Sequence, residues 1–275
     1  MTGAFADVSA VAIADLLSLH GRRAVVTGGA QGLGRAIAGR LAEAGAQVAI
    51  ADLGLEAAES AATGIAEARG ADVIGVRMDV ADSASVEAAA TKVVDAFGGI
   101  DIWVNNAGVF PSASVLDMSD EQWDHVFAVN TRGVRNGARE AARRMVEGGV
   151  IVNVISTAGF RGTAPGLAAY VGSKHAVRGM TKQMALELAP RGIRVLGVAP
   201  TFVPTEGNMA AAAAALAAMG DAGIDASNMP SAMSQSLIGR VGTPDDIARV
   251  VLFAASDLAT IMTGSTLLAD AGETI

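Results

Sequence analysis

Residues 23–44 read RAVVTGGAQGLGRAIAGRLAEA. The first five residues predict a short strand, a glycine turn follows, and the last ten show a helical pattern. This order leaves backbone N–H groups at the start of a helix, where they can hold a phosphate, and glycine lets the backbone approach the ligand. Gly28, Gly32 and Gly34 are spaced G-x-x-x-G-x-G rather than G-x-G-x-x-G, so the position of the cluster, more than its spacing, indicates a nucleotide site.

The next apolar run supplies a carboxylate at the place where a dinucleotide site needs one. Gln47–Ala51 predicts a strand that ends in Asp52. A carboxylate about 20 residues beyond the glycines can accept both ribose hydroxyls of NAD and would repel the 2′-phosphate of NADP. Because Leu53 follows it and Gln31 lies in the glycine turn, no cation stands ready for that phosphate, and we predict NAD. Asp52 as the N-cap of a helix over Leu55–Arg69 is an alternative that does not exclude the ribose role.

Strand-like and helical patterns alternate along the whole chain. The expected strands are Arg23–Thr27, Gln47–Ala51, Asp72–Arg77, Asp101–Val104, Val150–Ile155, Ile193–Val198 and Ile261–Ala269. Because they are apolar on both faces, they predict a single-domain α/β fold, a doubly wound, Rossmann-like parallel seven-stranded sheet with helices on both faces. Ligands of such sheets bind beyond the carboxyl ends of the strands. The residues at those ends are Gly28, Asp52, Asp79, Asn106, Ser156 and Thr201, and we expect them to converge on one site.

The segment Ser156–Lys174 carries three side chains that can do chemistry together. Tyr170, the only tyrosine of the chain, lies four residues before Lys174, so on a helix the two share one face. An unperturbed phenol titrates near pH ~10, too high for a base at neutral pH, and a neighbouring cation favours the phenolate. Tyr170 could then exchange a proton with a substrate oxygen that Ser156 holds. A Tyr and a Lys at this spacing also occur by chance in many helices.

Composition excludes several other classes of function. The net charge is −8 with a pI of about 4.9, which argues against nucleic acid and against anionic membranes as partners. Cys is absent, and the three histidines (His20, His125 and His175) show no metal-ligand spacing, so we predict no metal site. Residues 1–20 lack the basic region and clean apolar core of a secretory signal. We therefore predict a cytoplasmic protein with an N-terminal extension, residues 1–20, that carries a short helix around Val8–Leu19, followed by one domain over residues 21–275.

With these residues laid out, the chain resembles the short-chain dehydrogenase/reductase family over residues 21–272. The matching motifs, in order, are Thr27-Gly28 with Gly32-Leu33-Gly34, Asp79, Asn105-Asn106-Ala107-Gly108, Asn130, Ser156, Tyr170-x-x-x-Lys174, and Pro200 with Val203 and Thr205. The resemblance implies a catalytic tetrad. Tyr170 would be the general acid/base, and Lys174 would lower its pKa and hold the nicotinamide ribose. Ser156 would orient the substrate oxygen, and Asn130 would hold a water in a proton relay.

Cofactor contacts follow from the same resemblance and from the glycine turn. The predicted set is Gly28, Gln31, Gly32, Leu33, Gly34, Asp52, Leu53, Asp79, Val80, Asn106, Ala107, Gly108, Tyr170, Lys174, Pro200, Val203 and Thr205. The resemblance places Asp79 and Val80 at the adenine, Asn106 and Ala107 at the adenosine ribose, and Val203 and Thr205 at the carboxamide. The Asn105–Gly108 turn also has a purely structural interpretation. The chain departs from the family twice: Thr201 follows Pro200 where Gly is usual, and Ala271 replaces the first Gly of a usual Asp-Gly-Gly.

The segment at about 204–240 corresponds to the family's substrate lid and is rich in Ala and Met. It is either a flexible lid over an apolar substrate or a helix packed on the core or on another subunit. No Arg or Lys lies between Pro200 and Arg240 to grip an acid, and Arg161, the one nearby cation, is typical of a surface residue. Phe110, Phe160 and Phe202 could add apolar wall to the pocket.

These observations predict an NAD-dependent oxidoreductase that interconverts a secondary alcohol and a ketone, acting on an apolar, uncharged substrate such as a cyclic, aryl or steroid-like alcohol. A sugar or polyol dehydrogenase and a 3-oxoacyl thioester reductase are alternatives, and Asp52 disfavours the second because such reductases usually use NADPH. A non-catalytic NAD-binding sensor is a third, but sensors of this kind tend to lose the base or its lysine. Members of the family are mostly homotetramers, so we expect a homotetramer.

Overall fold

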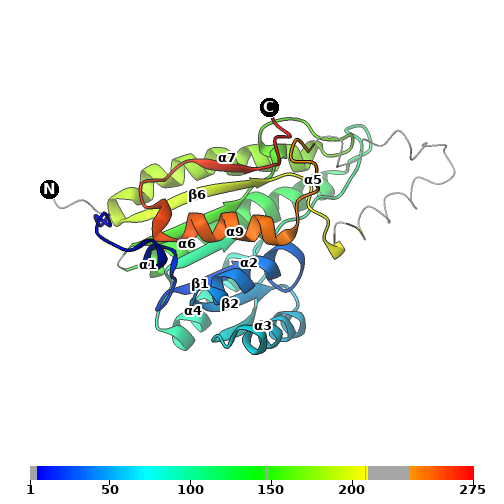
Figure 1. Ribbon diagram of the computed structural model, residues 1–275. Coiled ribbons are helices and arrows are strands. Elements are labelled where there is room, and N and C mark those ends of the chain that lie inside the picture. Colours follow the sequence, from blue (N-terminus) through cyan, green and yellow to red (C-terminus); the bar gives the residue numbers. More distant parts are fainter. Residues whose placement is uncertain (1–4, 147, 208, 210–235) are drawn as a thin grey trace.

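Seven strands and the helices between them make up the part of the chain that this computed structural model describes, residues 5–146, 148–207, 209 and 236–275 (Figure 1). The strands are β1 (Arg23–Thr27), β2 (Gln47–Asp52), β3 (Val73–Arg77), β4 (Ile102–Asn105), β5 (Gly149–Val154), β6 (Ile193–Pro200) and β7 (Thr266–Ala269). The α-helices are α1 (Ile13–Leu17), α2 (Gly32–Glu43), α3 (Leu55–Arg69), α4 (Ser83–Phe97), α5 (Asp120–Phe127), α6 (Gly133–Arg144), α7 (Ala168–Leu188) and α9 (Pro244–Ala255). Shorter turns are the π-helix η1 (Ala128–Arg132) and the 3₁₀-helices η2 (Thr157–Gly159), η3 (Ala189–Arg191) and η5 (Asp257–Ala259).

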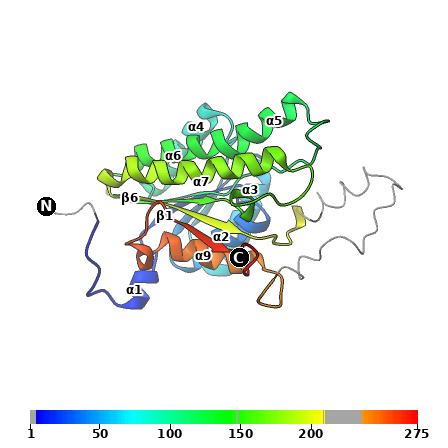
Figure 2. The same ribbon diagram turned by 90° about the horizontal axis from the view of Figure 1, so that it is seen from above.

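The described strands form one parallel sheet in the order β3-β2-β1-β4-β5-β6-β7. Apolar faces of α2, α3 and α9 pack on one side of the sheet, and those of α4, α6 and α7 pack on the other (Figure 2). This confirms the predicted doubly wound α/β sheet with helices on both faces. The chain begins in the middle of the sheet, winds outward to β3 and returns to β4 beside β1, so a topological switch point lies between β1 and β4.

The last strand is shorter than the sequence indicates. The apolar run Ile261–Ala269 predicts a strand throughout, but β7 begins only at Thr266. Gly264 has a φ of +71°, and its N–H bonds to the carbonyl of Val195 at 2.7 Å, while the hydroxyl of Thr263 accepts the N–H of Val195 at 3.0 Å. These residues therefore form a turn against β6, and an apolar pattern alone does not distinguish such a turn from a strand.

The N-terminal helix is also shorter than predicted. Instead of a helix around Val8–Leu19, α1 covers only Ile13–Leu17, and its N-cap Ala12 provides no side-chain hydrogen bond. A helix this short has little stability of its own. The segment is fixed by Leu19, which is buried in the core and bonds through its N–H to the carbonyl of Ala44 at 2.8 Å. Among the described residues, no helix combines the length and the apolar character that crossing a membrane requires.

The glycine turn after β1 packs directly against the end of β4. A Cβ on Gly28, whose φ is +61°, would lie 2.9 Å from the Cα of Ala107, and one on Gly34 would lie 2.1 Å from the carbonyl oxygen of Gly28. The side-chain amide of Asn106 donates to the carbonyls of Thr27 and Gly28 at 3.0 and 3.1 Å. Because only glycine lacks a Cβ, this close approach accounts for the glycines at these two positions.

A chain of buried polar side chains ties β4 and β5 to α7. The indole N–H of Trp103 donates to Oδ1 of Asn105 at 2.8 Å, and the amide of Asn105 donates to Oδ1 of Asn153 at 2.8 Å. The amide of Asn153 donates to the hydroxyl of Thr181 at 2.9 Å, which in turn donates to the carbonyl of Val177 at 2.8 Å. Because buried polar groups lose free energy when they are left unpaired, this chain holds α7 in one position on the sheet.

Two glycines of α2 allow a matched test of the close approach. We expect Gly34→Ala to lower the free energy of unfolding by about 1–3 kcal/mol, because the new methyl group overlaps the carbonyl of Gly28 and the amide of Asn106. Gly39→Ala in the same helix meets nothing within 4 Å and should be neutral or stabilising by up to about 1 kcal/mol, since Ala is the better helix former. Urea unfolding of both variants checks this; equal effects would contradict it.

Candidate active site

Tyr170, Ser156 and Lys174 meet beyond the carboxyl end of β5. Tyr170 and Lys174 lie one turn apart on α7, and both side chains face the end of β5 and the loop that follows it. The hydroxyl of Ser156 lies near the phenol of Tyr170 and lowers its pKa, and Oγ of Ser156 accepts the N–H of Ala158 at 3.1 Å, which caps η2. Nζ of Lys174 stands 5.6 Å from the centroid of the Tyr170 ring and donates to the carbonyl of Val154 at 2.9 Å.

Burial shifts the pKa values of both Tyr170 and Lys174. It raises the pKa of the Tyr170 phenol above its usual value, and the hydrogen bond with Ser156 opposes the rise only in part. It also lowers the pKa of Lys174 to about 8. The sequence predicts that Lys174 makes the phenol more acidic, but the polypeptide by itself gives the opposite direction. The physical reason is that the ammonium group bonds to Val154 and faces the ring, while the phenolate would lose its hydration.

Asn130 lies in a π-helical turn. This turn, η1, joins α5 to α6, and a single π turn of this kind is frequent at functional sites. The side-chain amide of Asn130 exchanges two hydrogen bonds of 2.8 Å with the backbone of Val109 and donates to the hydroxyl of Ser173 at 3.0 Å. Ser173 donates to the carbonyl of Tyr170 at 2.7 Å. These contacts fix Asn130 against α7, and the relay water stays a prediction.

Sequence reasoning missed Ser173, Asn153 and Thr181 as supports of the site. All three are buried polar residues that link α7 to the neighbouring elements. Ser173 had one signal, because it follows Tyr170 by three residues, the spacing at which a helical serine hydroxyl returns to a backbone carbonyl. Asn153 lies within an apolar strand and Thr181 in mid-helix, and no motif marks either one.

Asp52, the predicted ribose contact, lies beside the glycine turn. It is the last residue of β2, and its Oδ2 accepts the N–H of Ala30 at 3.1 Å. The N-cap of α3 is Gly54, so the alternative role of Asp52 as that N-cap is wrong. The side chain of Leu53 is exposed, as is that of Gln31, and neither carries a charge. Of these three residues, Asp52 is the ionisable one.

The other predicted cofactor residues lie along the same edge of the sheet. Pro200 ends β6, Ala107 and Gly108 follow β4, Val80 follows β3, and Leu33 lies in the first turn of α2. Asp79 caps a turn by accepting the N–H of Ala81 at 2.9 Å. Thr205 packs on the glycine turn, since a Cβ on Gly32 would lie 3.2 Å from its Cβ. Val203 is buried in the core, so its carboxamide contact stays a prediction.

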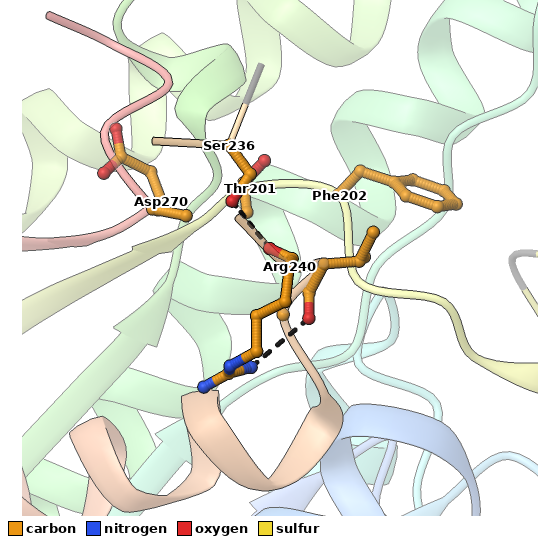
Figure 3. Close-up of a pocket in the computed structure, with 8 residues that line it drawn as sticks. Thr201, Phe202, Ser236, Arg240 and Asp270 are labelled. Carbon is orange, nitrogen blue, oxygen red and sulfur yellow. Dashed lines mark hydrogen bonds between the residues drawn. The ribbon is translucent and has the colours of Figure 1, made fainter. Parts of the chain in front are cut away.

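The segment proposed as a lid falls mostly outside the described residues, which here stop at 207 and 209 and resume at 236. Its described end helps to enclose a small cavity of about 10 Å³, room for about one water molecule (Figure 3). The labelled lining residues are Thr201, Phe202, Ser236, Arg240 and Asp270. Asp270 and Phe202 lie on opposite sides of Thr201, and no tetrad residue lines this cavity. Among the described residues, no three His, Cys, Asp or Glu side chains gather so that they could hold a metal ion.

The lowered pKa of Lys174 makes stability depend on pH. Between pH 8 and 10.5 the unfolded chain keeps the lysine proton and the folded chain releases it, so the free energy of unfolding rises with pH in this window. Relative to Lys174→Met, we expect the wild type to gain about 2–3 kcal/mol from pH 8 to pH 10, at about 1.36 kcal/mol per unit. Urea unfolding at each pH measures the difference. For Lys92→Met, at an exposed position on α4, the free energy of unfolding should depend on pH as it does for the wild type. The same pH dependence in Lys174→Met would contradict the lowered pKa of Lys174.

Known proteins share both the sequence and the fold. A family model described as enoyl-(acyl carrier protein) reductase matches residues 28–274. D-threitol dehydrogenase of Mycolicibacterium smegmatis is 39% identical over 259 residues, 94% of each chain, and the 3-oxoacyl-(acyl-carrier-protein) reductase FabG of Staphylococcus aureus is 37% identical over 91% of this chain and 97% of its own. The structure of a short chain dehydrogenase from Burkholderia cenocepacia in complex with NADP superposes with a TM-score of 0.82 at 37% identity, covering 94% of this chain and 99% of that one. The chain belongs to the short-chain dehydrogenase/reductase family, whose members are oxidoreductases that bind a nicotinamide cofactor.

Proposed function

We propose that the protein is an NAD-dependent oxidoreductase that interconverts a secondary alcohol and a ketone. The observation that carries the proposal is that the Ser156 hydroxyl lies near enough to the Tyr170 phenol to lower its pKa, beside the buried ammonium of Lys174. Two hydroxyl groups that meet in this way can both bond to one substrate oxygen. The phenol of Tyr170 can transfer a proton while the hydroxyl of Ser156 holds the substrate oxygen in place. Interconversion of an alcohol and a ketone requires both.

The glycine turn and Asp52 fit a bound dinucleotide. A Cβ on Gly28 or Gly34 would fill the space between this turn and the end of β4, and the first N–H groups of α2 point out of it with no side-chain cap from Gln31. Gly28, Gly32 and Asp52 would hold the phosphates and ribose, and Lys174 the second ribose. When bound, a nicotinamide ring supplies the acceptance or donation of hydride.

The protonation of Tyr170 suits the role of acid. Because burial raises the pKa of the phenol, Tyr170 carries its proton at neutral pH. In the reduction direction it gives this proton to the carbonyl oxygen, and the nearby ammonium of Lys174 stabilises the phenolate that is left. In the oxidation direction the same oxygen takes the proton of the substrate hydroxyl. Ser156 donates to the substrate oxygen in both directions.

Side chains near Tyr170 support an apolar, uncharged substrate. The ring of Phe110 meets that of Tyr170 edge to face, with centroids 6.0 Å apart, and Phe202 is 47% exposed at the exit of β6. Arg161, the nearby cation, forms a salt bridge with Glu273, so its charge is already balanced within the chain. The relatives favour two alternatives, a polyol and a 3-oxoacyl thioester, because one is named a D-threitol dehydrogenase and another a 3-oxoacyl reductase.

A substrate panel read by NADH absorbance tests the activity. It contains cyclic, aryl and steroid-like ketones and alcohols, threitol and other polyols, and a 3-oxoacyl thioester. We expect the apolar ketones to have the highest kcat/KM; a preference for polyols or thioesters would assign the protein to those classes instead. On the best substrate, Tyr170→Phe should lose about 10²–10⁴-fold in kcat, the usual contribution of a general acid, while its Kd for NADH stays within twofold of the wild type.

The choice of cofactor is tested at Asp52. We expect the wild type to have at least about tenfold higher kcat/KM for NAD than for NADP, because the carboxylate repels a 2′-phosphate. Asp52→Asn keeps an oxygen that can accept the N–H of Ala30 and removes the charge, so the preference should narrow mainly through a lower KM for NADP. Asp72→Asn, at an exposed position outside the site, is the charge-matched control. Equal use of both cofactors by the wild type would contradict the assignment, and the NADP complex of the relative makes this comparison informative.

A further inference from the structure

A carboxylate beyond β7 is bonded to the loop that carries Ser156. Oε1 of Glu273 accepts hydrogen bonds from the guanidinium of Arg161 and, at 3.5 Å, from the hydroxyl of Thr157. Oε2 accepts the hydroxyl of Thr201, at the exit of β6. The Glu273 side chain is only 11% exposed, although it carries a formal charge. One carboxylate thus joins three segments that are far apart in the sequence.

The turn that holds Glu273 is itself fixed. Oδ1 of Asp270 accepts the N–H of Gly272 at 3.1 Å, and Oδ2 accepts the N–H of Thr274 at 3.0 Å and its hydroxyl at 2.6 Å. Burial raises the pKa of Asp270, but these bonds outweigh it and lower that pKa, so the carboxylate stays charged. Ala271 has a φ of +55°, a conformation that costs free energy for any residue with a Cβ and persists only where the surrounding bonds impose it.

The bonded loop determines where the Ser156 hydroxyl stands. Thr157 is the first residue of η2, and Ser156 caps this turn through the N–H of Ala158. On its other side the loop is held by Arg178 of α7, whose guanidinium lies 3.9 Å from the centroid of the Phe160 ring. Because η2 is only three residues long, it has little stability of its own, and its orientation depends on contacts with other segments, among them those that Glu273 and Arg178 supply.

We propose that Glu273 is a positioning residue of the active site, which holds η2 and thereby the Ser156 hydroxyl in the geometry for hydrogen bonding to Tyr170 and to the substrate oxygen. The consequence for turnover rests on the proposed function, but the effect on the loop does not. Thr201, which stands where the family usually has Gly, supplies one of the three hydrogen bonds to Glu273. A glycine at this position could not form that bond.

Hydrogen exchange of the full-length protein tests the positioning directly. Glu273→Gln keeps the shape of the side chain and removes its charge, so the bonds to Arg161 and Thr201 weaken while the fold is retained. We expect amides in peptides covering residues 157–161 to exchange about tenfold faster than in the wild type, with the strands of the sheet unchanged. Thr201→Val, which removes one donor, should give a smaller increase in the same peptides. Glu187→Gln, at an exposed position on α7, is the control and should change the exchange rate neither of the 157–161 peptides nor of the strands.

Kinetics then separate positioning from general support of the fold. On the best substrate, Glu273→Gln should lower kcat about tenfold and leave the Kd for NADH within twofold, because only the Ser156 side of the site is displaced. In a Ser156→Ala background the same change should have no further effect on kcat. Unchanged exchange over residues 157–161 would overturn the proposal, and so would a fully additive loss in that background. If the wild type turns over no compound of the panel, the proposed function fails while the exchange result still decides the role of Glu273.

Discussion

The contact between the glycine turn after β1 and the end of β4 is the constraint on which the rest of the site depends. Two polypeptide segments meet there at distances that no Cβ allows, and the amide of Asn106 bonds them together through the carbonyls of Thr27 and Gly28. Because β1 and β4 are neighbours at the switch point, this contact aims the first turn of α2 at the same edge of the sheet where β5 delivers Ser156. This packing therefore places the predicted cofactor side of the site next to the strand end that carries Ser156.

At the other side of the site, the folded chain favours the protonated form of the Tyr170 phenol. The ammonium of Lys174 is buried and Tyr170 is partly buried, and burial favours the neutral form of each. Such a pair responds strongly to any charge that arrives next to it, since a low local dielectric strengthens every Coulomb interaction. The buried hydrogen bonds from Trp103 to Thr181 keep α7 from relaxing away from the sheet, and that rigidity is what makes the burial effective.

The relatives show that this scaffold does not by itself select a substrate. At similar identity they are named a D-threitol dehydrogenase and a 3-oxoacyl reductase, although the fold is shared over nearly the whole chain. Specificity must come from the segments around the strand ends, which pack on the scaffold without belonging to it. In this chain those segments bring Phe110 against Tyr170, and Glu273 bonds to Arg161 and Thr157 in the loop after Ser156.

The sequence by itself determined the fold class, the parallel sheet with helices on both faces and the edge where the site residues gather, because alternating apolar runs and glycines at a strand–helix junction are local patterns with few physical solutions. It also picked out Tyr170, Lys174 and Ser156, since their spacing is a local property. It did not determine the direction of the pKa shift of Tyr170, the π turn at Asn130, the start of β7 or the role of Glu273. Those depend on which groups exclude water and which atoms lie opposite one another after folding, and only the tertiary structure decides contacts between segments as distant as Thr157 and Glu273.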